Sequence, residues 1–173
     1  MHVENQKNEG HPESNDSDPP EPSDPPEPDF VVHVDSEVEG VNASWLQHYG
    51  LKAIHEIRST PAVNSSVAVR VLDDQSMREL HQQHSGINET TDVLTFNQSD
   101  GIIDIAICKD FALRESERRS HDLNSELLLY IVHGLLHCFG HDDKTDRDYE
   151  LMHLEEDKIL VAIGVGTIWS GEK

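Results

Sequence analysis

Basic residues are scarce in this sequence, which argues against a protein that binds nucleic acid through a broad charged face. The 173 residues include 13 lysines and arginines against 34 aspartates and glutamates, a net charge of −21. From residue 44 to the end, 22 acidic residues still outnumber 12 basic ones, leaving a net charge of −10. Non-specific affinity for RNA is therefore expected to be poor, although a small local basic cleft remains compatible with this balance.

Cysteines and long apolar runs are also rare. Cys108 and Cys138 are too few for the disulfide framework of a secreted domain, so we expect two reduced, partly buried thiols. No stretch approaches the roughly 18 consecutive apolar residues of a membrane span, and the chain does not open on a basic-then-apolar signal peptide. These absences predict a cytoplasmic protein with no membrane partner.

The first 29 residues differ in composition from the rest of the chain. They hold seven of the eight prolines and nine acidic residues against a single lysine. Such a segment has no hydrophobic period and repels itself, so we expect a disordered, acidic, proline-rich tail over residues 1–29. One folded domain is expected over residues 30–164, followed by a short C-terminal tail at 165–173.

Strand and helix patterns alternate over residues 30–164. Strands are predicted at 30–34, 67–72, 92–96 and 102–108, and helices from about 45 to 57, 74 to 85, 111 to 119, 124 to 139 and 146 to 163. Residues 127–132 are apolar on every side, which is typical of a helix buried at the centre of a domain. The pattern predicts a single compact α/β domain, with a mixed sheet of about four strands, helices on its faces and this central buried helix.

The residues that indicate chemistry lie at the end of that central helix. His133 and His137 are four apart, which places both imidazoles on one helix face at a separation that suits two ligands of one metal ion. Gly140 ends the helix, and a His-Asp-Asp cluster at 141–143 follows. Two helix ligands and one ligand from the turn leave a fourth zinc position open, as in catalytic sites.

A metallopeptidase of the HExxH type would carry glutamate directly after the first histidine, as its general base. Here that position is Gly134, which disfavours a peptidase.

The segment from His133 to Asp143 resembles the YbeY family of bacterial zinc endoribonucleases, whose pattern is roughly H-G-x-L-H-x-x-G-Y-D-H. Residues 91–96 (Thr-Asp-Val-Leu-Thr-Phe) resemble the family's T-[ND]-V-L-S-F strand, and residues 104–108 its D-I-V-I-C strand. Met152, Glu155, Ile159 and Leu160 resemble its closing helix. The blocks run in the family's order over about 67–164, and the 1–29 segment has no counterpart.

The resemblance implies a compact α/β fold that holds one zinc ion at the end of its central helix. It also implies cleavage of single-stranded RNA, in maturation of the 3′ end of small-subunit ribosomal RNA and in ribosome quality control. The implied partners are single-stranded regions of ribosomal RNA and the ribosome or its proteins, and not DNA.

The chain departs from the family at the third metal ligand. The family's third histidine falls at Asp143 and its tyrosine at His141, so either residue could supply that ligand. We favour His133, His137 and Asp143, because Asp143 holds the family position and a carboxylate is an accepted zinc ligand. Asp142 is a weaker candidate for a general base, and we assign no catalytic residue.

A second departure concerns phosphate binding. Ser85 stands where the family carries an arginine, and serine does not replace the planar guanidinium fork that clamps phosphate. Arg70 compensates only if its side chain faces the cleft. Two alternatives to an endoribonuclease therefore stay open: a ribosome-assembly factor with a zinc site but no nuclease activity, and a zinc hydrolase that acts on peptides or small molecules.

Overall fold

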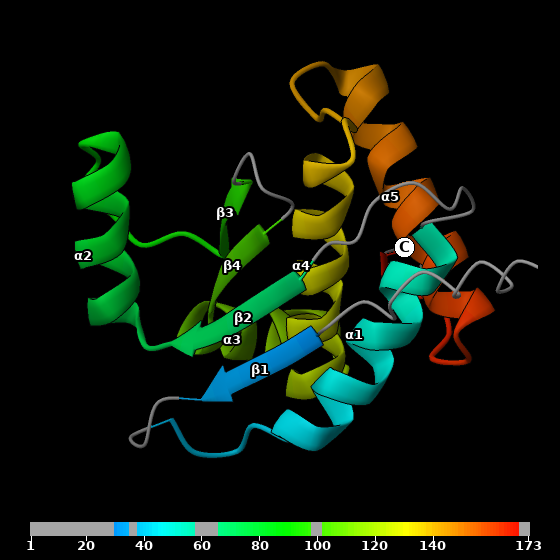
Figure 1. Ribbon diagram of the computed structural model, residues 1–173, viewed down its shortest axis with the longest axis horizontal. Coiled ribbons are helices and arrows are strands. Elements are labelled where there is room, and N and C mark those ends of the chain that lie inside the picture. Colours follow the sequence, from blue (N-terminus) through cyan, green and yellow to red (C-terminus); the bar gives the residue numbers. More distant parts are fainter. Residues whose placement is uncertain (1–29, 35–37, 58–65, 98–101, 170–173) are drawn as a thin grey trace, which may run out of the picture.

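The computed structural model describes residues 30–34, 38–57, 66–97 and 102–169, and the acidic segment 1–29 lies outside them. The described elements, in chain order, are β1 (Phe30–Val34), α1 (Ala43–Ile57), β2 (Ser66–Leu72), α2 (Asp74–Ser85), β3 (Val93–Asn97), β4 (Ile102–Cys108), α3 (Lys109–Arg119), α4 (Leu123–Cys138) and α5 (Asp146–Ala162) (Figure 1). The predicted α/β class is confirmed.

The strands form one mixed sheet in the order β1-β2-β4-β3. β1 pairs with β2 and β2 with β4 in parallel, whereas β3 runs antiparallel to β4 at the sheet edge. Thr95 of β3 lies opposite Ile105 of β4. This register places the two strands that resemble the family blocks next to each other.

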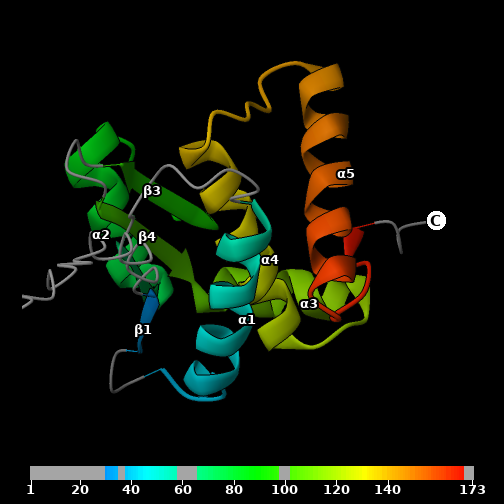
Figure 2. The same ribbon diagram turned by 45° about the vertical axis from the view of Figure 1, so that its right-hand side comes forward.

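The alternation of apolar side chains gives each face of the sheet its own core. Valines 67, 69 and 71 of β2 and isoleucines 103, 105 and 107 of β4 pack with α1 and α4 in the larger core. Leu72, Ala106 and Cys108 belong to a smaller core with Met77 of α2. Figure 2 shows the resulting arrangement, with α1, α4 and α5 on one side of the sheet and α2 on the other.

Helix α4 is buried along most of its length, because residues 127–132 are apolar all round. It packs against β3 and β4 on one side and against α1, α3 and α5 on the others. At Gly134 the helix approaches the sheet so closely that an added Cβ would lie 2.8 Å from Thr95 Cγ2. A larger residue at position 134, including the glutamate of an HExxH motif, would force Thr95 to shift and would crowd Val93 and Ile105.

Three local details differ from, or add to, the sequence prediction. Helix α4 begins at Leu123, because the carboxylate of its N-cap, Asp122, accepts hydrogen bonds from the N–H groups of Asn124 and Ser125. Helix α3 begins at Lys109, directly after β4, and not at Phe111. Within the part assigned to a C-terminal tail, Ile168 is buried against the core.

No helix in the described ranges has both the length and the apolar character that a bilayer crossing requires. The two cysteines, Cys108 and Cys138, are free thiols, the first buried and the second half-buried. Burial raises the pKa of the Cys108 thiol to about 11, so this thiol stays protonated near neutral pH.

Candidate metal centre

The last two turns of α4 bring His133 and His137 together. Four residues make slightly more than one helical turn, so both rings project from the same face. Their Nε2 atoms lie 2.9 Å apart, and the ring centroids are 4.5 Å apart at nearly a right angle. Two imidazole nitrogens that face one another in this way can both coordinate a single ion.

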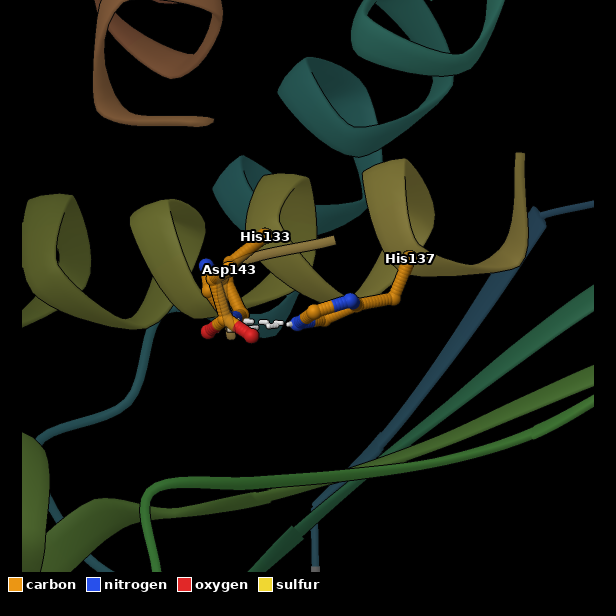
Figure 3. Close-up of side chains that lie close together, drawn as sticks. All are labelled: His133, His137 and Asp143. Carbon is orange, nitrogen blue, oxygen red and sulfur yellow. Dashed lines mark hydrogen bonds and ion pairs between the residues drawn. The ribbon is translucent and has the colours of Figure 1, made fainter. Parts of the chain in front are cut away.

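The turn after α4 returns a carboxylate to this point. Gly140 adopts a left-handed conformation with φ of 94°, which favours glycine, and it lets the chain reverse after Phe139. Asp143 then lies over the two rings, with its Oδ2 atom 3.6 Å from Nε2 of His133 and 3.6 Å from Nε2 of His137 (Figure 3). Among the described residues, these are the ones whose donor atoms converge enough to share an ion.

The donor set fits a zinc ion. Neighbouring ligand atoms of a tetrahedral zinc with bonds of about 2.0–2.2 Å are separated by roughly 3.3–3.6 Å. The three separations here, 2.9, 3.6 and 3.6 Å, bracket that value. Two imidazole nitrogens and one carboxylate oxygen are also the donor types that zinc accepts, and three protein ligands leave a fourth position for water or substrate.

His141, the alternative third ligand, points elsewhere. Its side chain is exposed and lines a separate cavity of about 250 Å³ with Glu56 and Lys158. Its backbone carbonyl, however, accepts a hydrogen bond from His137 Nδ1 at 3.1 Å. That bond places the proton of a neutral His137 on Nδ1 and leaves Nε2 as the donor atom for a metal.

Glu156 of α5 gives His133 the same support, and the sequence did not reveal it. The buried carboxylate accepts from His133 Nδ1 at 2.6 Å and from His153 Nδ1 at 2.5 Å. Burial disfavours the charged forms, but the hydrogen bond and opposite charge across it outweigh burial, so the pKa of His133 is raised and that of Glu156 lowered. Glu156 thus orients His133 with Nε2 toward the site.

Glu155, the acidic residue of α5 that the family resemblance includes, has no such contact: it lies on the outside of the helix, paired with Lys158 at 2.8 Å. The sequence feature that could have identified Glu156 is its spacing from apolar residues of the same helix. Glu156 lies four residues after Met152 and four before Leu160, both of which are buried, so it shares their inward face.

Asp142 does not face the cluster. Its side chain is paired with Lys144 at 2.8 Å, and this hydrogen bond lowers the pKa of the carboxyl. A stabilised, solvent-facing carboxylate is poorly suited to take a proton at the site, so its candidacy as general base gains no support.

Neither residue considered for phosphate binding lies at the site. Ser85 is exposed at the end of α2. Arg70 alternates with buried Val69 and Val71, so it projects from the sheet face opposite α4, where it lines a cavity of about 420 Å³ with His84 and Phe96. Arg70 therefore does not compensate for the missing arginine.

The three donor residues open into a cavity of about 300 Å³ between α4, α5 and the edge strand β3. Its lining is rich in carboxylates, namely Asp92, Glu115, Asp143 and Glu156. Arg119 also lines it, but the guanidinium is ion-paired with Glu115 at 3.5 Å and with buried Glu126 at 3.4 Å. The charged groups of the cavity are therefore mostly acidic, and a divalent cation would offset part of this charge.

The fold and the site define the class of protein: an α/β domain whose central helix, with the turn after it, presents a two-histidine, one-carboxylate donor set to a cleft. A family model described as Endoribonuclease YbeY matches residues 33–164. The chain belongs to the Endoribonuclease YbeY family.

Individual relatives agree with the family match. The Endoribonuclease YbeY of Wolinella succinogenes is 32% identical over 103 residues, which cover 57% of this chain and 72% of the relative. That of Caldanaerobacter subterraneus subsp. tengcongensis is 28% identical over 154 residues, covering 78% and 98%. The solution structure of TM1509 from Thermotoga maritima shares the fold, with a TM-score of 0.52 and 23% identity over 77% of this chain and 90% of that one.

Proposed function

We propose that this chain is an endoribonuclease that depends on one zinc ion, held by His133, His137 and Asp143, and that cuts single-stranded regions of ribosomal RNA. The observation that carries the proposal is the convergence of three donor atoms on one point in a chain of this family. The proposed role is maturation of the 3′ end of small-subunit ribosomal RNA and ribosome quality control in the cytoplasm, with the ribosome or its proteins as partner.

The protein's own residues prepare the site for phosphodiester hydrolysis. The His141 carbonyl and the Glu156 carboxylate hold the Nδ1 protons of His137 and His133, so that both Nε2 lone pairs face the cleft. The third donor, Asp143, brings a negative charge that a histidine would not. A bound divalent ion supplies Lewis acidity, which polarises a phosphoryl oxygen and acidifies water.

A carboxylate in place of the family's third histidine tunes that chemistry. It lowers the net positive charge of the loaded site, so the acidifying effect on water is weaker than in a three-histidine site. We therefore expect a slower enzyme at neutral pH than a three-histidine relative, with an activity that keeps rising toward alkaline pH.

One observation favours an assembly factor without nuclease activity as a second candidate. Among the described residues, Arg119 is the arginine that lines the cleft, and its guanidinium is paired with carboxylates. Ser85 and Arg70 lie outside the cleft. A site without an unpaired guanidinium clamps a phosphate less tightly. Peptide hydrolysis has no such support, because Gly134 stands where an HExxH metallopeptidase carries its general-base glutamate.

The test is cleavage of a single-stranded fragment from the 3′ end of small-subunit ribosomal RNA by purified full-length protein. We expect strand scission that disappears on treatment with a chelator and returns on adding zinc, because the Lewis acid is removed and restored. A duplex of the same sequence serves as the control and should remain intact. Zinc binding without any scission would instead support the assembly factor.

A further inference from the structure

Beside the metal donors, the cleft carries a cluster of rings that the proposed chemistry does not use. Tyr149, His153 and Trp169 all line the same cavity as His133. Tyr149 is 43% exposed, although it is a large aromatic residue close to a polar site. Trp169 lies beyond residue 164, where the family match ends.

Stacking and hydrogen bonds hold two of these rings, His153 and Trp169, in place. Trp169 stacks on His153, with ring centroids 3.6 Å apart and planes 13° from parallel. The backbone N–H groups of Ile168 and Trp169 both donate to Asp157 Oδ1, at 2.9 and 3.1 Å. His153 is fixed in turn by its hydrogen bond to Glu156. A pre-organised surface of this kind binds a flat ligand at little entropic cost.

Tyr149 forms the outer part of this cluster. Its ring packs perpendicular to His153, with centroids 4.2 Å apart, and to Trp169, with centroids 5.6 Å apart. Perpendicular packing places these two rings against part of the tyrosine, and 43% of the residue stays exposed. The position is close to the candidate metal centre, because Tyr149 contacts His153, which shares the Glu156 carboxylate with His133.

The charge of the cleft decides which part of a nucleotide this surface suits. At positions other than the metal centre, the lining carboxylates repel a phosphate. Arg119 does not offset this repulsion, because it is already paired with Glu115 and Glu126. Stacking of a neutral base on an aromatic ring is not opposed by that charge, and it is the contact by which proteins hold single-stranded RNA without reading its sequence. An acidic protein needs such a contact more than a basic one does.

We propose that Tyr149, supported by His153 and Trp169, is a stacking platform for one base of the single-stranded RNA, next to the bond that is cleaved. The inference rests on the proposed function, which supplies the RNA. The proposed subsite on α5 accepts any of the four bases. The phosphate next to the stacked base would then lie at the three metal donors.

The test uses short single-stranded RNAs that carry the fluorescent base 2-aminopurine at successive positions. Its emission is quenched when it stacks on a tyrosine or tryptophan ring. Binding to full-length, metal-loaded protein is read within seconds of mixing, before cleavage accumulates. We expect quenching at one position beside the cleaved bond, and a Tyr149→Ala variant that loses this quenching and binds about tenfold more weakly or worse. Tyr149→Phe keeps the ring and should behave as the wild type.

Leu154→Ala is the matched control, since Leu154 is 66% exposed on the same helix and does not line this cavity. Zinc content and thermal unfolding of all three variants should equal those of the wild type. Unchanged binding and quenching in Tyr149→Ala, or an equal loss in Tyr149→Phe, would overturn the platform. Intact RNA after prolonged incubation, with the Tyr149 dependence preserved, would refute the nuclease and leave the platform standing.

Discussion

Replacement of His137 with alanine is expected to abolish zinc retention and RNA cleavage together. The variant leaves His133 and Asp143 as two donors, and two ligands on a partly exposed site hold zinc poorly compared with three. The loss of the Lewis acid should lower the cleavage rate by on the order of a thousandfold or more, because a catalytic metal contributes several kcal/mol to transition-state stabilisation.

The rate is measured on the same single-stranded RNA, with zinc content determined on the same samples. His48→Ala is a suitable control, because His48 is exposed on α1 and lies outside the cleft. The fold should survive the His137 change, since this side chain is only half-buried at the end of α4. A variant that has lost its metal and still cleaves RNA at the wild-type rate would contradict the proposed mechanism.

Replacement of Glu156 with glutamine is expected to weaken zinc binding by about 10–100-fold, although Glu156 is not itself a ligand. A carboxylate accepts from both His133 and His153, whereas an amide has one acceptor oxygen, so one imidazole loses its partner or must change tautomer. The negative charge that makes His133 a better donor is lost as well.

The dissociation constant for zinc is measured by competition with a chelator of known affinity. Glu155→Gln is the matched control, because it makes the same change one residue away in an ion pair on the outside of the helix. A purely structural role for Glu156 would lower the thermal stability of the metal-free protein and leave zinc affinity unchanged. Wild-type affinity in Glu156→Gln would therefore refute the orienting role.

Much of the fold was predictable because its elements carry simple periodic patterns. The valines at 67, 69 and 71 alternate as a strand with one buried face does, and the all-apolar run at 127–132 indicates a central helix. The same alternation already implies that Arg70 faces away from the valines. Which face meets α4, however, depends on how the sheet and helices pack, so the distance of Arg70 from the cleft emerged only in three dimensions.

The candidate site was predictable where its residues are close in sequence. His133 and His137 follow from helix geometry, and Asp143 follows from the family position after the glycine turn. Glu156 lies 23 residues from His133 and reaches it only because α5 packs against α4. Trp169 joins the same cleft from a segment whose sequence has no evident pattern. Contacts of this kind depend on tertiary packing, which a single sequence does not encode locally.

The account depends most directly on which residues hold the metal. The decisive measurement is metal content by mass spectrometry on tag-free protein, comparing the wild type with His133→Ala, Asp143→Ala and His141→Ala. We predict about one zinc per chain in the wild type, as for a mononuclear site, with loss in the first two variants and retention in His141→Ala. Zinc lost with His141 and kept with Asp143, or a wild type that takes up no zinc at all, would contradict the account.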